Sequence, residues 1–136
     1  HMRSSSRTRM KMLLFFCDLD YMKIINDALG HLEGDRAIMD VASILKKTFR
    51  EADIIARIGG DEFAILSLNT ADISPEYLLK RLQHQFDRHN AEANRSYQLH
   101  ISIGWAAFDP EDPRTLDDLM TRADTAMYEQ KKVKRL

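Results

Sequence analysis

Acidic residues at two places in the chain are the side chains best suited to chemistry. Asp61 and Glu62 stand together in the segment ARIGGDEFAIL, and Asp18 ends an apolar run. Carboxylates that converge repel: at ~5 Å and an effective dielectric near 20, each pair costs roughly 3 kcal/mol. A divalent cation removes that cost, and Mg²⁺ takes one or two carboxylates besides water and substrate phosphates. The acids indicate a phosphate-handling metal site, although solvated turns are also rich in Asp, Glu and Gly.

A second pair of polar residues, Asn26 and Asp35, is suited to reading a nucleobase. An amide and a carboxylate match the O6, N1–H and N2–H groups of guanine, whereas adenine would leave the carboxylate facing an acceptor. Lys23 adds a positive charge that could contact a phosphate at the same edge. Capping of helix ends is the alternative for Asn26 and Asp35, and it is the usual role of either residue alone.

The hydrophobic pattern predicts the elements that must position these residues. In chain order it indicates a buried strand at 12–17, helices at 21–29 and 33–50, hairpin strands at 53–58 and 63–68, a helix from Pro75, a strand at 97–108 and a helix after Thr115. This order of β, α, α, β-hairpin, α, β and α predicts an α/β (α+β) fold. Its central sheet should be mixed, mostly antiparallel and flanked by helices.

Several local details follow from the same pattern. Gly59 and Gly60 should supply the positive φ of a tight hairpin turn, with Asp61 and Glu62 at its tip. Thr115 and Asp118 should form a capping box. Leu99, Ile101 and Ile103 alternate with His100 and Ser102 as in a half-buried strand. The inward faces of the first and last helices are expected to carry Ile24, Ile25, Ala28 and Leu29, and Leu116, Leu119, Met120, Ala123 and Met127.

Composition limits the class of protein. The chain has 136 residues, 44% hydrophobic residues and a formal net charge of -1, which suits one globular domain without a general attraction to nucleic acid or anionic membranes. No apolar run approaches the ~20 residues that span a bilayer. Cys17, the single cysteine, lies in an apolar run that predicts a buried thiol. We expect residues 1–11 to be a cloning scar and linker remnant, and residues 12–136 to form the domain.

Taken together, these residues resemble the GGDEF-domain family, the diguanylate cyclases. The signature appears unaltered as Gly59-Gly60-Asp61-Glu62-Phe63. The segments DLDYMKIIND, GHLEGD, SIG and RADTAMY surround it in the family's order and spacing, so the resemblance runs from about residue 12 to 135. It implies a palm-like, nucleotide-cyclase-like sheet and a magnesium-dependent enzyme, with Mn²⁺ as a plausible substitute.

The resemblance also implies a role for each matching residue. Asp18, Asp61 and the carbonyl of Leu19 would hold the metal, and Glu62 would bind a second metal or help to deprotonate the attacking hydroxyl. Gly60 would let the chain pass close to the nucleotide.

Nucleotide contacts are implied in the same way. Asn26 and Asp35 would read guanine. Phosphate contacts would come from the side chains of Lys23, Lys131 and Arg135 and from the backbone amides of Tyr21 and Met22.

The implied reaction joins two GTP molecules into cyclic di-GMP and releases two pyrophosphates. One domain holds one GTP, so the resemblance implies a catalytic homodimer. Arg50 and Asp53, in the tetrapeptide READ, match the family's inhibitory product site at its usual offset from the signature, with Arg81 as a further contact. The resemblance also implies a cytoplasmic domain attached to an upstream regulatory domain.

Some positions depart from the family pattern. Met22 stands where phenylalanine is usual, and Gln130, Lys134 and Leu136 stand where alanine, glycine and asparagine are usual. Two other functions remain open from the sequence: a non-catalytic module that binds GTP or cyclic di-GMP and regulates an attached domain, and a small nucleic-acid-binding domain. The intact acids argue against the first, and the near-neutral charge argues against the second.

Overall fold

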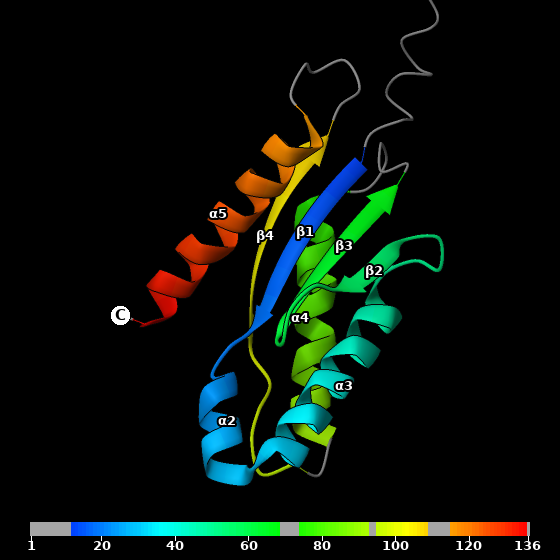
Figure 1. Cartoon of the computed structure of the whole chain (residues 1–136). Coiled ribbons are helices and arrows are strands. Elements are labelled where there is room, and N and C mark those ends of the chain that lie inside the picture. Colours follow the sequence, from blue (N-terminus) through cyan, green and yellow to red (C-terminus); the bar gives the residue numbers. More distant parts are fainter. Residues whose placement is uncertain (1–11, 69–73, 93–94, 109–114, 136) are drawn as a thin grey trace, which may run out of the picture.

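The computed structural model describes residues 12–68, 74–92, 95–108 and 115–135, which form a four-stranded sheet with helices on both faces (Figure 1). The elements in chain order are β1 (Met12–Leu19), α2 (Met22–Leu29), α3 (His31–Thr48), β2 (Ile54–Arg57), β3 (Glu62–Leu68), α4 (Pro75–Glu92), β4 (Ile101–Phe108) and α5 (Leu116–Arg135). The sheet order is β2-β3-β1-β4, and all neighbours in it are antiparallel. The predicted fold class and order of elements are confirmed. Residues 1–11 lie outside the described part, so the expected domain boundary stays a prediction.

β1 is one of the two inner strands, and its side chains alternate between two cores. Phe15 and Cys17 pack into the cluster that includes residues of α3 and α4, whereas Leu14 and Phe16 pack against α5. Figure 1 shows these helices on opposite sides of the sheet. A continuous apolar run is therefore required in β1, because both of its faces are covered.

The predicted inward faces of two helices were partly wrong. In α2, Ile25 is buried, but Ile24 is 63% exposed and Ala28 and Leu29 are also exposed. Because α2 spans eight residues and packs mainly against α3, it buries only a narrow stripe of its surface. In α5, Leu119, Ala123 and Met127 are buried and Met120 is exposed; the side chain of Leu116 lies outside the described part.

β4 also differs from the half-buried strand that the sequence predicts, and it begins only at Ile101. Ser102 is fully buried, as are Gly104 and Ala106 on the same face, which is covered by α5. A β-carbon on Gly104 would overlap the α5 backbone and would lie 2.8 Å from the carbonyl carbon of Ala126. The small residues thus allow α5 to pack directly on β4.

The predicted capping box starts α5. The Asp118 amide donates to Thr115 Oγ1 (3.2 Å), and the Thr115 amide donates to Asp118 Oδ2 (3.3 Å). Two backbone donors at the start of the helix, which have no partner within it, are thereby satisfied.

The predicted hairpin is present, but its glycines do not have the predicted conformation. β2 and β3 pair antiparallel, yet neither Gly59 nor Gly60 has a positive φ. Residues 58–61, which we call the signature turn, separate the strands, and a turn of this length needs no left-handed residue. Ile58 closes it by donating its amide proton to the Glu62 carbonyl (3.0 Å), and Arg57 donates to the carbonyls of Gly59 (3.1 Å) and Gly60 (2.6 Å). These contacts fix the shape of the turn.

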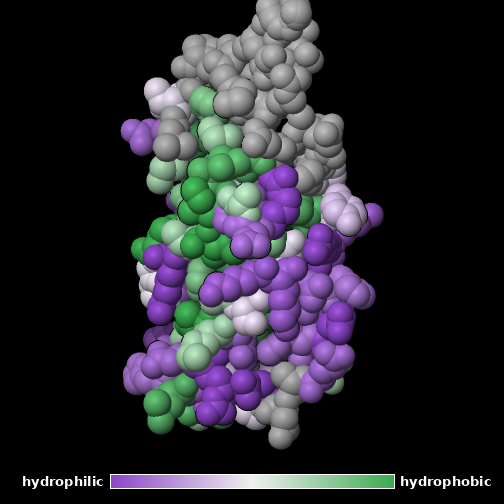
Figure 2. Space-filling view, turned by 90° about the vertical axis from the view of Figure 1, so that its right-hand side faces the viewer, coloured by the Kyte–Doolittle hydropathy of each residue, from purple (hydrophilic) through white to green (hydrophobic). Residues whose placement is uncertain are grey.

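The surface on the right-hand side of Figure 1 is uneven in polarity. Figure 2 shows hydrophobic surface gathered in its upper and middle part and hydrophilic surface over most of its lower part. Large apolar side chains that remain exposed include Ile54 of β2 and Ile58 of the turn. Within the described ranges, none of the helices is both long and apolar enough to span a membrane.

Candidate metal and nucleotide site

The acids singled out in the sequence meet where β1 ends. In the sheet register Asp18 lies opposite Glu62 of β3 and opposite Ser102 of β4. The next residue, Leu19, donates its amide proton to the carbonyl of Asp61 (3.0 Å). Antiparallel pairing therefore brings Asp18 beside the signature turn, which is distant in sequence but adjacent in the sheet.

Asp18 has an ammonium group and a second carboxylate as neighbours. Lys131 of α5 places Nζ 2.9 Å from Asp18 Oδ2, and both side chains are largely buried. Burial raises the pKa of Asp18 to about 6; the hydrogen bond from Lys131 opposes this rise, and the charge of Asp61 adds to it. Asp18 is thus a carboxylate whose charge is poorly compensated by the protein alone.

The donor set around Asp18 fits a divalent cation. Asp18 Oδ1 is buried and, among the described residues, accepts no hydrogen bond. Asp61 is close enough to raise the pKa of Asp18, so a cation between them would relieve their repulsion. The described ranges contain no ready-made group of three His, Cys, Asp or Glu side chains around one point. A cation here would therefore complete its shell with water or phosphate oxygens, as Mg²⁺ does.

A hollow of about 300 Å³ adjoins these acids. Its lining residues are Leu19, Asp20, Tyr21, Met22, Lys23, Ile24, Asp61 and Lys131. All but Asp20 and Ile24 were predicted from the sequence as site residues, so the fold brings most of the predicted metal and phosphate contacts to one place. Tyr21 has a φ of 63°, the left-handed region that non-glycine residues seldom adopt, where the chain turns from β1 into α2.

The signature turn leaves room beside the hollow. A β-carbon on Gly60 would meet nothing within 4 Å, so the turn is open on that side. Glu62, the first residue of β3, is half-buried, and its Oε1 would lie 3.0 Å from a β-carbon on Gly59. The Glu62 side chain therefore lies over Gly59 in the turn.

The last predicted phosphate contact comes from the end of α5. Arg135 ends this helix, but its side chain lies outside the described part. The phosphate contact of Arg135 therefore stays a prediction.

The residues predicted to read guanine lie on the α2–α3 pair. Asn26 Oδ1 is buried and has no hydrogen-bond partner within the described chain. Gly34 of α3 packs against it: a β-carbon there would overlap Oδ1 and lie 2.9 Å from Cγ. Asp35 follows Gly34 and is exposed. Gly30, with φ 91°, makes the turn that folds α3 back on α2 and donates its N–H to the Asn26 carbonyl (2.9 Å).

The predicted product site lies elsewhere, beside the start of β2. Arg50 Nη2 lies 3.1 Å from Asp53 Oδ1, and the Arg50 amide donates to Asp53 Oδ2 (2.9 Å). Arg50 also donates to the carbonyl of Leu68. Arg50 and Asp53 border a hollow of about 500 Å³, which Lys46, Glu51 and Ile55 also line.

Arg81, the third residue predicted for the product site, has a different contact. Its guanidinium donates to the Lys47 carbonyl at 3.5 Å, and it is absent from the lining of the hollow beside Arg50. A role for Arg81 in product binding therefore stays a prediction.

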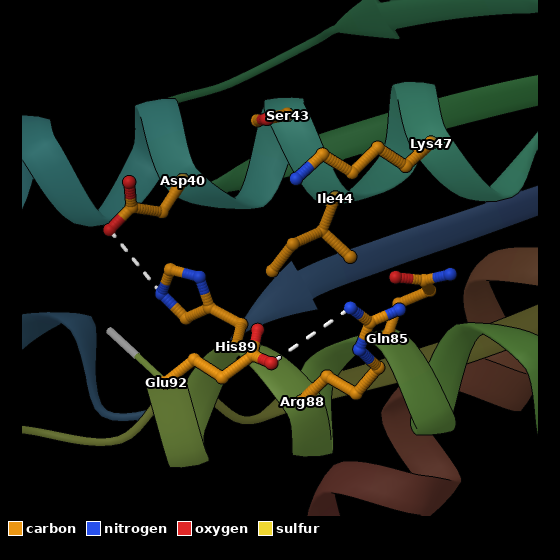
Figure 3. Close-up of a pocket in the computed structure, with 8 residues that line it drawn as sticks. All are labelled: Asp40, Ser43, Ile44, Lys47, Gln85, Arg88, His89 and Glu92. Carbon is orange, nitrogen blue, oxygen red and sulfur yellow. Dashed lines mark ion pairs between the residues drawn. The ribbon is translucent and has the colours of Figure 1, made fainter.

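A larger hollow of about 630 Å³ lies between α3 and α4, and Figure 3 shows its lining side chains. Two close contacts join side chains of its lining: His89 Nε2 lies 3.5 Å from Asp40 Oδ2, and Arg88 lies 3.9 Å from Glu92. Asp40 also pairs with Arg95, whose Nε lies 3.0 Å from Oδ2. Its lining, among the residues that the structure describes, includes none of the site residues predicted from the sequence. Its size alone does not make it the functional site.

Sequence reasoning missed three residues that the structure places at the site: Gly34, Asp20 and Ser102. Gly34 limits the room beside Asn26, and Ser102 donates its hydroxyl proton to Asp20 Oδ1 (2.8 Å). Each of the three stands inside a segment that carried the resemblance: GHLEGD, DLDYMKIIND and SIG. The motifs that contain these residues were recognised, but the contacts that the residues make with distant segments cannot be predicted from the spacing of motifs along the chain.

Comparison with known proteins identifies the family. The family model described as "Diguanylate cyclase, GGDEF domain" matches residues 1–136. This chain belongs to the GGDEF-domain family. It is similar to Diguanylate cyclase DgcP of Escherichia coli, with 36% identity over 126 residues that cover 91% of this chain and 36% of DgcP.

Two further relatives support the same assignment. The bifunctional diguanylate cyclase/cyclic di-GMP phosphodiesterase MucR of Pseudomonas aeruginosa is 40% identical over 124 residues, which cover 87% of this chain and 17% of MucR. An EAL/GGDEF domain protein from M. capsulatus has a similar structure, with a TM-score of 0.78 and 35% identity; the match covers 90% of this chain and 79% of that chain. The chain thus spans about a third or less of the length of the two curated relatives.

Proposed function

We propose that this GGDEF domain is a diguanylate cyclase that condenses two GTP molecules into cyclic di-GMP. The observation that carries the proposal is Asp18 Oδ1, which is buried beside Asp61 and has no hydrogen-bond partner among the described residues. A carboxylate pair with an unsatisfied oxygen suits a metal-dependent phosphoryl transfer. The names of the relatives support the same reaction class.

In the proposed reaction, the 3′-hydroxyl oxygen of each GTP bonds to the α-phosphorus of the other GTP. The bond from that phosphorus to the bridging oxygen breaks, and pyrophosphate leaves with the electron pair. Each hydroxyl proton passes to a base, for which Glu62 or solvent is available. A bound Mg²⁺, or Mn²⁺ in its place, supplies charge stabilisation for the phosphates. Two domains must face each other, so a homodimer is part of the proposal.

The hollow beside β1 would hold the cation and the phosphates. Asp18, Asp61 and the Leu19 carbonyl are the proposed ligands of the cation. The proposed phosphate contacts are the side chains of Lys23, Lys131 and Arg135 and the amides of Tyr21 and Met22.

The α2–α3 pair would hold the base. Asn26 and Asp35 are the proposed guanine-reading residues, and the buried Oδ1 of Asn26 without a partner in the described chain supports this role. The open side of Gly60 would admit the nucleotide.

Product would bind at the start of β2 and provide feedback. Arg50 and Asp53 are the proposed contacts, with Arg81 as a further one. The hollow of about 500 Å³ beside Arg50 and Asp53 supports this assignment. We place the domain in the cytoplasm under the control of an attached regulatory domain.

The test is production of cyclic di-GMP from GTP and Mg²⁺, followed by chromatography. The chain alone and a fusion to a dimerising segment are compared, with Asp61→Asn and Glu62→Gln as site variants and Glu92→Gln as an exposed control on α4. Product in the parent and the control that is lost in Asp61→Asn supports the cyclase. Cyclic di-GMP that binds to a parent unable to make it would instead support a receptor that regulates an attached domain.

A further inference from the structure

Lys131 lies between two carboxylates of the same strand end. Its Nζ is 2.9 Å from Asp18 Oδ2 and 3.9 Å from Asp20 Oδ1. The side chains of Lys131, Asp18 and Asp20 are 16%, 13% and 5% exposed, respectively. Solvent therefore screens these charges only weakly, and the position of the ammonium group depends on the two acids.

Asp20 is held in place by β4 and the segment before it. Ser102 Oγ, which is fully buried, donates to Asp20 Oδ1 (2.8 Å), and the Asp20 amide donates to the carbonyl of His100 (2.8 Å). Both the side chain and the backbone of Asp20 are thus fixed from the same stretch of chain. This carboxylate cannot follow Lys131 if the lysine moves, so it acts as a stationary charge.

The ion pair with Asp18 conflicts with the proposed role of that residue. A cation on Asp18 Oδ1, the oxygen without a partner in the described chain, and the Lys131 ammonium group on Oδ2 would repel each other across one carboxylate, so cation binding favours a shift of Lys131 away from Asp18. The carboxylate of Asp20 is a second ion-pair partner that the Lys131 ammonium group could reach with only a small movement, since Nζ already lies 3.9 Å from Asp20 Oδ1. Lys131, Asp20 and Asp61 line the same hollow, so a lysine paired with Asp20 would stay beside it.

We propose that Asp20 is a positioning residue that receives Lys131 from Asp18 when the divalent cation binds. The transfer removes the positive charge next to the cation on Asp18 and keeps the ammonium group where a triphosphate would enter. The inference rests on the proposed function only in placing the cation at Asp18. Ser102 takes part by holding Asp20 still.

The test measures Mn²⁺ binding without nucleotide, by electron paramagnetic resonance, in the parent, Asp20→Asn, Lys131→Met and the double variant. Asparagine keeps the acceptor for Ser102, so folding should persist, which circular dichroism checks. We expect Asp20→Asn to weaken Mn²⁺ binding about tenfold, because Lys131 then has only Asp18 as a partner; coupling energies between sites commonly give factors of this size. In the Lys131→Met background the same substitution should have little effect.

The double variant distinguishes two ways in which Asp20 could affect Mn²⁺ binding: by holding Lys131, or by the direct attraction of its own negative charge. If Asp20→Asn weakens binding equally with and without Lys131, Asp20 acts only through its own charge and the inference is wrong. Unchanged Mn²⁺ binding in Asp20→Asn, or no Mn²⁺ binding by the folded parent, also overturns it. The expected Mn²⁺ pattern in a protein that makes no cyclic di-GMP would support the inference while the proposed reaction fails.

Discussion

Gly34 lies directly against the side-chain amide of Asn26, and no larger residue fits between the two helices at this point. A β-carbon on Gly34 would lie 2.9 Å from Asn26 Cγ and overlap Oδ1. The position of the proposed base-reading amide is thus set by a residue with no side chain. The contact joins α2 to α3 where the two helices pack.

Gly34→Ala should displace Asn26 and weaken GTP binding about tenfold or more, since small misplacements at a site have large effects. Binding of a non-hydrolysable GTP analogue measures this, with Ser43→Ala on the exposed face of α3 as control. Equal affinity in Gly34→Ala and the parent would show that Asn26 does not contact the base.

Asp35→Ala should reduce the preference for GTP over ATP, because the carboxylate pairs with donors that only guanine carries. Competition between the two nucleotides for the folded protein measures the preference. The exposed Glu76→Ala on α4 is the control. A preference that remains unchanged would remove Asp35 from the base-reading set.

Arg50→Ala should weaken binding of cyclic di-GMP by about tenfold, because its guanidinium is the proposed charged contact to the product. Calorimetric titration gives the affinity, and Lys46→Ala, on the same hollow, separates a specific contact from general charge. Undiminished affinity in Arg50→Ala would place the product elsewhere.

Gly104→Ala should destabilise the fold by about 2 kcal/mol or more, since the new β-carbon meets the backbone of α5 and not a flexible side chain. Denaturation in urea measures the free energy of unfolding, and Ala107→Ser at an exposed position of β4 is the control. A loss no larger than that of the control would mean that α5 can shift away without strain.

Cys17 should resist thiol reagents in the folded protein. It is 1% exposed, and burial raises its pKa to about 12, so the reactive thiolate is scarce at neutral pH. Reaction with a chromogenic disulfide reagent should therefore be slow until denaturant is added. Rapid reaction without denaturant would mean that β1 opens to solvent.

The order of elements and the capping box could be predicted from the sequence because they depend on neighbours along the chain. The burial of single side chains was predicted wrongly where it depends on packing against another helix or strand. Ser102 is polar yet fully buried because α5 covers it, and Ile24 is apolar yet exposed because α2 buries only a narrow stripe. Gly59 and Gly60 led to the right hairpin for the wrong reason, since the turn is longer than the tight turn that requires a positive φ.

The site could be predicted as a set of residues but not as an arrangement. The register of β1 with β3 explains why Asp18 lies beside Asp61, and that register could only be inferred from the order of strands. The pairing of Lys131 with Asp18 depends on how α5 lies on the sheet, which no local pattern encodes.

The hydrogen bond from the Leu19 amide to the Asp61 carbonyl ties Asp61, one of the proposed metal ligands, to β1, an inner strand of the sheet. Local opening costs the most free energy in such a strand and the least in a short helix with little buried surface, such as α2. In the proposed site, the cation side is therefore formed by β1, which resists local opening, and the base side by α2, which opens more easily. Partial opening of the domain would release the base before it disturbed the cation.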